Sequence, residues 1–321
     1  MAEQRIVAIA GGVGGAKLAH GLQLALPNAG ALSVIVNTAD DFDLYGLRIC
    51  PDLDTVMYTL AGLANPATGW GIEGDSFATL GMLARYSGEP WFQLGDRDFA
   101  THVHRTQQLR SGATLSEVTA SMASALGIRA ALIPMTDDRV ATMIDTPDGR
   151  LDFQDYFVAR RHGDRVLGVQ FDGISLARPC ESALRAIAEA SAIIFCPSNP
   201  IVSLGPVLAV PGMRDAIERS SAPVVAVSPI VGGRALKGPA DSMLDSLGHE
   251  VSAAGVAALY LGLLDGIVID EADAALAEQI ESSGMRVVVT RTVMQSYEDR
   301  AQLARETLGF AATLAATLPA P

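Results

Sequence analysis

The stretch GGVGGAKLAHGL, Gly11 to Leu22, decides how the chain begins to fold. It follows the short apolar run RIVAIA, and four of its first five residues are glycine. A strand, a glycine turn and a helix predict the first β-α unit of a doubly wound sheet. Glycines let a backbone approach an anion, and a helix N-terminus favours negative charge. The glycines are Gly11, Gly12, Gly14 and Gly15.

The glycine turn does not identify its ligand, because plain turn geometry explains it equally well. Its spacing differs from the P-loop and from G-x-G-x-x-G, and Lys17 is not followed by Ser or Thr. We therefore do not expect an NTPase or a simple dehydrogenase.

Further apolar runs and helical patterns alternate along the chain, as in a parallel sheet buried on both faces. The predicted strands are RIVAIA (5–10), ALSVIVNT (31–38), SAIIFC (191–196), APVVAV (222–227), DGIVI (265–269) and MRVVV (285–289). The predicted helices cover about 14–26, 54–62, 75–86 and 294–318, and a Thr-x-x-Glu capping box begins another at Thr114.

The middle of the chain, about 127–169, has a different pattern. The runs RAALIP, RVATMIDT and LDFQDYFV predict short antiparallel strands joined by turns. We expect one α/β domain, 1–321, with a mostly parallel Rossmann-like sheet. Residues 85–170 would form an inserted α+β region that covers the substrate.

Composition excludes several classes of protein. The net charge is −13, which argues against binding to nucleic acid or to an anionic membrane. Cys50, Cys180 and Cys196 are odd in number and widely spaced, so we expect no disulfide framework and a reducing cytoplasm. The start MAEQRIVAIAGG lacks a signal-peptide layout, and we expect a soluble, cytoplasmic protein.

Polar tails follow the predicted strands, at the sheet edge where open α/β proteins bind ligands. In PSNP, Ser198 and Asn199 offer hydrogen bonds to a phosphate or base, although a rigid turn explains the motif too. In SPIVGGRALKGP, which begins at Ser228, two further glycines would again let the backbone approach an anion closely. Two cations follow them and either contact a ligand or are solvated. The residues are Gly232, Gly233, Arg234 and Lys237.

Acidic residues between the second strand and the next helix suggest a magnesium site. Carboxylates near a phosphate site suit Mg²⁺, which takes oxygen ligands. A solvated acidic loop is the alternative for Asp40, Asp41 and Asp43. Asp52 and Asp54 stand at a helix start, where an N-cap role is the alternative to a ligand role and does not exclude it.

The patch LGDRDFATHVHR (94–105) is the other dense group of charges. Its His102 and His104 do not predict a zinc site, because residues two apart do not share a helix face and no third His or Cys is near. Arg97, flanked by two carboxylates, is either a structural ion pair or a substrate contact. No nucleophile elbow, catalytic triad or cysteine nucleophile is evident.

Taken in order, these motifs resemble the 2-phospho-L-lactate transferase family over nearly the whole chain. The most specific stretches are CPDLDTVMY (50–58), LGDRDFATH (94–102) and PSNPIVSLGP (197–206). A sister family that binds UDP-sugars, the gluconeogenesis-factor-like proteins, shares the N-terminal layout. It has a DDGGSSG-like segment where this chain has ADDFDLYG (39–46).

The resemblance implies a step in the synthesis of coenzyme factor 420, a deazaflavin. The family moves a phospholactyl group from a guanosine-diphosphate-linked donor to the ribityl hydroxyl of Fo (7,8-didemethyl-8-hydroxy-5-deazariboflavin), with Mg²⁺, and releases GMP. Bacterial members of the phosphoenolpyruvate transferase type use the enolpyruvyl donor, and a glyceryl analogue occurs. The motifs do not choose among these three acyl groups.

The resemblance also implies roles for individual residues. Asp54 and Arg97 would contact Fo. Asp54 and Asp52 would serve the chemistry, and Asp41 and Asp52 the metal. Guanosine diphosphate would lie on Gly11, Gly12, Gly14, Gly15, Lys17, Ser198, Asn199, Ser228, Gly232 and Gly233. The family suggests a homodimer. The alternatives are a UDP-sugar-binding regulatory protein and a dinucleotide oxidoreductase.

Overall fold

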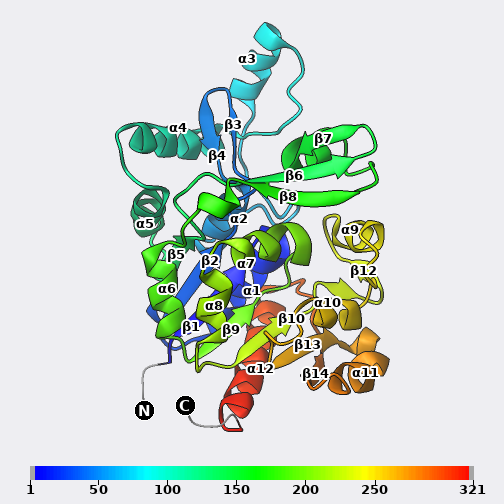
Figure 1. Ribbon diagram of the computed structural model, residues 1–321. Coiled ribbons are helices and arrows are strands. Elements are labelled where there is room, and N and C mark those ends of the chain that lie inside the picture. The colour runs from blue at the N-terminus through cyan, green and yellow to red at the C-terminus, as the bar shows by residue number, and fades with distance from the viewer. Residues whose placement is uncertain (1–3, 318–321) are drawn as a thin grey trace.

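A computed structural model of the protein describes residues 4–317; the predicted helix end at Leu318 lies outside the described residues. Its centre is a parallel sheet with the order β14-β13-β10-β9-β1-β2-β5 (Figure 1). The strands are β1 Ile6–Ala10, β2 Leu32–Val36, β5 Ala131–Pro134, β9 Ala192–Phe195, β10 Val224–Val227, β13 Gly266–Asp270 and β14 Arg286–Thr290. All six predicted apolar runs lie in this sheet, which confirms the doubly wound α/β class.

One strand prediction is wrong. The run RAALIP was expected in an antiparallel hairpin, but β5 pairs in parallel with β2 at the edge of the main sheet. Pro134 has no N–H to donate, and an edge strand tolerates it. The burial of Leu132 and Ile133 against the two cores outweighs the local turn-like signals.

Helices cover both faces of the sheet. One face packs against α1 Gly12–Ala25, α2 Pro51–Leu60, α5 Leu115–Ala125 and α12 Tyr297–Ala315. The other packs against α6 Glu181–Ala188, α7 Gly205–Ala209, α8 Met213–Glu218, α9 Ala240–Ser246, α10 Ala253–Leu259 and α11 Ala277–Glu281. Near-continuous apolar strands are what a sheet buried on both faces requires.

Local signals explain where several helices begin. Thr114 and Glu117 form the predicted capping box of α5, and Ser296 and Asp299 form another at α12. In α2 the N-cap position belongs to Cys50, with Pro51 as the first helical residue. The two aspartates of α2 therefore lie inside its first turn, where they complement the helix dipole.

Smaller elements lie above the main sheet in Figure 1. They are α3 Ala78–Ser87, α4 Asp96–Arg110, the hairpin β3 Phe42–Leu44 with β4 Leu47–Ile49, and the sheet β7-β6-β8 (Gly149–Asp152, Ala141–Thr146, Gly168–Asp172). The predicted antiparallel pairing of RVATMIDT with the following run is confirmed. Only Leu151 and Asp152 of LDFQDYFV lie in a strand. The second half of the run forms a π-helical turn, Asp155–Ala159, that buries the ring of Tyr156.

The order of the strands places a switch point beside β1. This strand pairs with β2 on one side and with β9 on the other. The chain builds the β2 side first and later returns to build the β9 side. Ligands of open α/β sheets bind at such a point, outside the carboxyl ends of the strands.

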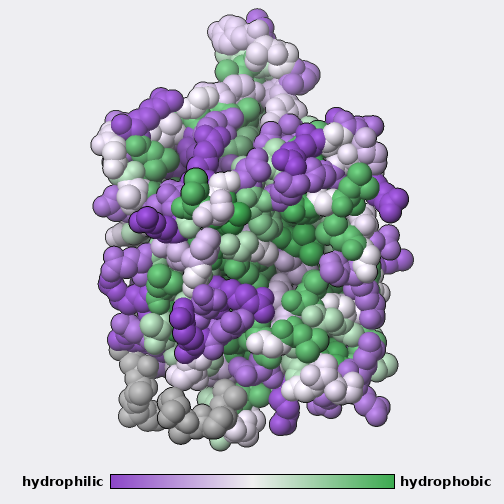
Figure 2. All heavy atoms as spheres, in the orientation of Figure 1, coloured by the Kyte–Doolittle hydropathy of each residue, from purple (hydrophilic) through white to green (hydrophobic). Residues whose placement is uncertain are grey.

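The visible surface is mixed in character. Figure 2 shows hydrophobic residues gathered between the three-stranded sheet and the helices α9 and α10, while hydrophilic residues dominate the periphery. Over residues 4–317, no helix combines the length and the apolar character needed to cross a bilayer.

Candidate functional site

A cavity of about 750 Å³ lies at the switch point of the sheet. Its wall combines the glycine turn after β1, the tails of β9 and β10, and parts of α2 and α4. Nine of the residues predicted for the site line it. They are Gly11, Gly12, Gly14, Lys17, Asp52, Asp54, Ser198, Asn199 and Ser228.

The glycines of the turn are needed for close packing inside the protein. A Cβ at Gly14 would lie 2.2 Å from the Pro197 carbonyl oxygen, and one at Gly15 would lie 2.5 Å from Ser198 Oγ. The Gly11 N–H donates to Ser198 Oγ at 3.1 Å, so the turn after β1 is joined to the tail of β9. The turn is thus a junction between two strand ends as well as part of the cavity wall.

Asp52 holds the glycine turn against α2. Its Oδ1 accepts the Gly12 N–H at 2.8 Å, and Gly12 has a φ of +64° that suits glycine. The N–H groups of Gly11 and Gly12, expected to face a phosphate, are therefore used within the protein. An anion at this turn would therefore not bond these two N–H groups.

Asp40 and Asp52 form a pair of buried carboxylates on the cavity wall. Asn37 Nδ2 donates to both, at 3.1 and 3.0 Å. Burial raises the pKa of Asp40 well above its usual value, with Asp52 adding to the effect, and burial also raises the pKa of Asp52. Among the described residues, Asp40 Oδ1 has no hydrogen-bond partner and neither carboxylate has an ion-pair partner. Two oxygen donors with uncompensated charge fit a hard divalent cation.

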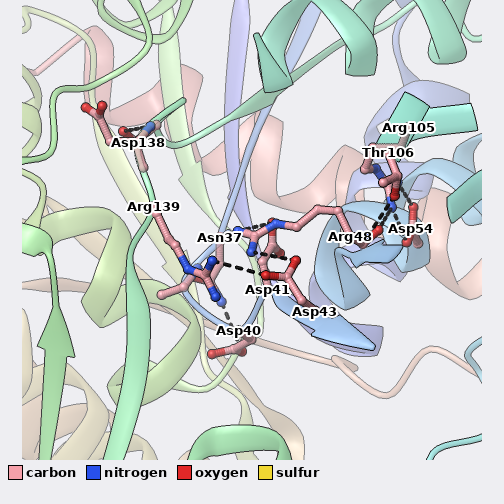
Figure 3. A network of polar contacts seen from close by, with 12 residues as sticks. Asn37, Asp40, Asp41, Asp43, Arg48, Asp54, Arg105, Thr106, Asp138 and Arg139 are labelled. Atoms are coloured by element: carbon pink, nitrogen blue, oxygen red, sulfur yellow. Dashed lines mark hydrogen bonds and ion pairs between the residues drawn. The ribbon is translucent and has the colours of Figure 1, made fainter. Parts of the chain in front are cut away.

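Asp41, the neighbour of Asp40 in the chain, has an arginine as its ion-pair partner. Its nearest cation is Arg48, whose Nη2 lies 3.6 Å from Asp41 Oδ2, and Arg48 also reaches Asp43 at 3.7 Å (Figure 3). Burial raises the pKa of Asp41 to about 7. Asp43 pairs with Arg139 at 3.1 Å and lines a separate cavity of about 510 Å³. Asp41 is thus buried beside Arg48 and does not line the main cavity.

A second charged group lies on the main cavity wall, where α2 meets α4. Arg105 forms a two-point ion pair with Asp54 and is buried with it. The His102 ring lies between carboxylates, with Nδ1 3.6 Å from Asp54 Oδ2 and Nε2 3.2 Å from Asp98 Oδ1. Tyr58 Oη donates to Asp98 Oδ1 at 2.7 Å. Ligand atoms of Asp54, Asp98 and His102 lie within 4.8 Å of one another, so this group could also hold a metal ion.

From this group, sequence reasoning assigned only Asp54 to the site. It considered His102 with His104 as a pair two residues apart, yet His104 is exposed and His102 is buried. The informative spacing was Asp98, His102 and Arg105, which lie on one face of α4. The same spacing relates Asp54 to Tyr58 in α2.

The remaining predicted residues lie outside the cavity wall or make local bonds. Arg97 is exposed, and its guanidinium donates to the Glu73 carbonyl oxygen at 3.3 Å. The Gly232 N–H donates to the carboxylate of Asp273 at 3.0 Å. Gly15, Asp41, Arg97, Gly232 and Gly233 are absent from the cavity lining.

Asn199 and Ser228 line the cavity and also stabilise their own loops. Asn199 Oδ1 accepts the Ile201 N–H at 2.9 Å, and Ser228 Oγ donates to the Ile230 carbonyl oxygen at 2.9 Å. The rigid-turn and ligand interpretations of PSNP are therefore compatible.

Aromatic and apolar side chains form another part of the wall. Sequence reasoning did not identify them as site residues, because an apolar side chain in a helix or loop carries no chemical signature of its own. They include Tyr58, Trp70, Phe92, Phe153 and Phe157. The cavity thus combines a polar region at the glycine turn with an aromatic region suited to a flat ring system.

Comparisons with known proteins agree over nearly the whole chain. A family model described as 2-phospho-L-lactate transferase CofD matches residues 6–306. A phosphoenolpyruvate transferase of Streptomyces avermitilis is 46% identical over 313 residues, which cover 96% of this chain and 98% of the relative. A 2-phospho-L-lactate transferase of Methanosarcina acetivorans is 40% identical over 306 residues, which cover 95% and 98%.

A solved structure supports the fold. A UPF0052-family protein of Bacillus halodurans aligns with a TM-score of 0.62 at 15% identity, covering 96% of this chain and 100% of that chain. This likeness concerns the fold alone. The family match and the full-length relatives carry the assignment, and the chain belongs to the CofD family of 2-phospho-L-lactate transferases.

Proposed function

We propose that this protein transfers a phosphoenolpyruvyl group from enolpyruvyl-2-diphospho-5'-guanosine to the ribityl hydroxyl of Fo and releases GMP. The observation that carries the proposal is the single cavity in which a carboxylate-rich polar region adjoins an aromatic region. The enolpyruvyl donor is favoured over the lactyl donor because the phosphoenolpyruvate transferase reported above is the more similar relative, at 46% against 40% identity.

The chemistry requires one bond to form and one to break. The acceptor oxygen attacks the phosphorus that carries the enolpyruvyl group, and the bond to the bridging oxygen of GMP breaks. Such transfer depends on positioning and charge neutralisation more than on covalent catalysis. The hydroxyl proton needs an acceptor close to the aromatic region of the cavity.

The polar region would hold the donor and Mg²⁺. Asp52 and Asp40 would be the protein ligands, whereas Asp41, which follows Asp40 in the chain, is paired with Arg48. Bound Mg²⁺ would neutralise charge on the diphosphate. Lys17, Ser198, Asn199 and Ser228 line the same region and would contact the nucleotide.

The group between α2 and α4 would hold the acceptor. Asp54 and Asp98 place carboxylate oxygens on the wall, and each can orient the ribityl hydroxyl or take its proton. Arg105 and His102 fix the direction of these carboxylates. Arg97 is proposed as an Fo contact from the family resemblance alone, since its guanidinium bonds a backbone carbonyl outside the wall.

Within 85–170, α4 and the π-helical turn would act as the cap of this site, because Phe92, Asp98 and Phe157 line the cavity. Strand β5 and helix α5 of the same segment belong to the main sheet and its cover. We also propose that the protein forms a homodimer. Exposed apolar side chains on and beside α3, among them Phe77, Met82 and Tyr86, are consistent with such an interface. Sedimentation equilibrium would give the oligomeric state.

The test is a product assay. The protein, Mg²⁺ and Fo are incubated with the lactyl, enolpyruvyl or glyceryl donor, and GMP and the deazaflavin product are quantified by chromatography and mass spectrometry. We expect GMP and a product of the enolpyruvyl mass in equal amounts. Asp54→Asn should lower the rate at least 100-fold, whereas Asp43→Asn, outside the cavity wall, should retain it. Absence of GMP with all three donors would reject the proposal.

A further inference from the structure

The composition of cations in this chain is uneven. Of 23 Lys and Arg residues only two are lysine, Lys17 and Lys237. They are 220 positions apart in the sequence, yet both line the cavity at the glycine turn. Everywhere else the chain uses arginine for positive charge. The two lysines therefore mark the region where an ammonium group is used and a guanidinium is not.

Lys17 approaches the cavity from the second turn of α1. Its Nζ donates to the Met294 carbonyl oxygen at 2.9 Å, and the side chain is half-buried. Burial lowers the pKa of Lys17, and the positive charges of Arg300 and Lys237 lower it further. The two ammonium groups are thus close enough to affect each other electrostatically. An anion between them would relieve this repulsion.

Lys237 approaches from the loop after the small β11–β12 ribbon, Ile230–Val231 with Arg234–Ala235. Its Nζ donates to the Thr68 carbonyl oxygen at 2.6 Å. The next residue, Gly69, has a φ of +80°, and a Cβ there would lie 2.8 Å from Val13 Cγ1 and 2.9 Å from Lys237 Nζ. The loop around Gly69 therefore lies directly against both the glycine turn and Lys237.

We propose that Lys17 and Lys237 form an ammonium clamp on the diphosphate of the donor, and that Lys237 ties the loop carrying Trp70 to the bound donor. The clamp rests on the proposed function, since it names the residues that hold the same donor. It supplies the phosphate contacts that Gly11 and Gly12 do not, because their N–H groups bond Ser198 and Asp52.

The chemistry of the two side chains explains why lysine is used. An ammonium has three N–H donors on one compact atom. Lys237 can give one to the Thr68 carbonyl and direct the others to phosphate oxygens. The five N–H donors of arginine lie in one fixed plane, so they cannot be aimed independently at the carbonyl and the phosphates, and the larger guanidinium would meet Gly69. An arginine at position 237 would therefore not be a conservative replacement.

Chemical labelling tests the clamp without any turnover. The chain has only two lysines, so mass spectrometry can follow their acetylation individually at limiting acetic anhydride. GDP with Mg²⁺ is expected to slow acetylation at both lysines about tenfold. Guanosine, which has no phosphate, is the matched control and should leave Lys237 unprotected. Unchanged acetylation of Lys237 at saturating GDP, or failure of GDP to raise the melting temperature, would overturn the clamp.

Substitutions test the preference for an ammonium. By calorimetry, Lys237→Met and Lys237→Arg should each weaken GDP binding about tenfold, whereas Arg234→Met, on the exposed ribbon nearby, should bind as the wild type does. Wild-type affinity in Lys237→Arg would refute the preference. If GDP protects both lysines but no deazaflavin product forms, the clamp is supported and the proposed transferase reaction is rejected. The two proposals can therefore fail separately.

Discussion

The ion pair between Asp54 and Arg105 shows what a single buried charge requires. Both side chains are almost fully buried, at 5% and 2% exposed. The pair is bonded at two points and faces His102 on one side. Removing one partner of such a pair leaves the other charge uncompensated, which costs far more than losing an exposed pair.

Arg105→Met is expected to lower the free energy of unfolding by about 3–5 kcal/mol. Urea denaturation followed by circular dichroism would measure it. Arg305→Met is the matched control, because its pair with Glu298 is on the surface and its loss should change little. Equal effects of the two substitutions would show that Asp54 is not held as described.

His20 gives the protein a pH-dependent stability. Burial and Arg300 lower its pKa from 6.5 to about 4. The unfolded chain therefore binds a proton that the folded chain rejects, and stability is lost as the pH falls from about 6.5 to about 4. Between pH 7 and 4.5, the free energy of unfolding should fall by on the order of 1–2 kcal/mol more in the wild type than in His20→Asn. Urea titrations at pH 7 and 4.5 would measure this difference, and exposed His104→Asn should behave as wild type.

At the residue scale, the sequence predicted the donor end of the cavity better than the acceptor end. Gly14, Ser198 and Asn199 follow strands directly, so the edge of the sheet brings them together. Asp98 and His102 could not be linked to Asp54 from the sequence, because their meeting depends on how α4 docks on α2. Only the helical spacing within α4 indicated a shared face.

The element that most depends on exact packing is the glycine turn between β1 and α1. Gly14→Ala would place a Cβ 2.2 Å from the Pro197 carbonyl oxygen, so the tail of β9 must move. We expect a loss of about 1–3 kcal/mol in stability. Gly81→Ala is the control, since nothing lies within 4 Å of its Cβ in helix α3. That change should be neutral or slightly stabilising, and thermal unfolding would compare the two.

The strands show where pattern reasoning succeeds and where it fails. Six apolar runs were long enough to predict their place in a buried parallel sheet. Strand β5 was misassigned because its short run ends in Pro134 and precedes a genuine hairpin region. Its register with β2 comes from burial against α5 and α6, which no local signal in that run encodes.

For the whole molecule, the switch point beside β1 explains why distant segments share one site. The tails of β1 and β9 end next to each other although about 185 residues separate them. The segments folded above the sheet then add α4 and the π-helical turn to the opposite wall. The sequence predicted that the sheet edge and an inserted region would form the site together, but not which side chains face one another across the cavity.

Trp70 gives the molecule a built-in optical reporter. The chain has only two tryptophans, Trp70 on the cavity wall and Trp91 packed against Phe42 and Phe92. A deazaflavin ring bound beside Trp70 should quench indole emission by energy transfer. Titration with Fo should therefore reduce emission in the wild type and in Trp91→Phe. Trp70→Phe should keep part of the response, because Trp91 packs against Phe92 of the same cavity wall and energy transfer does not require contact. Acceptor binding could then be followed in real time, without a label and before any product forms.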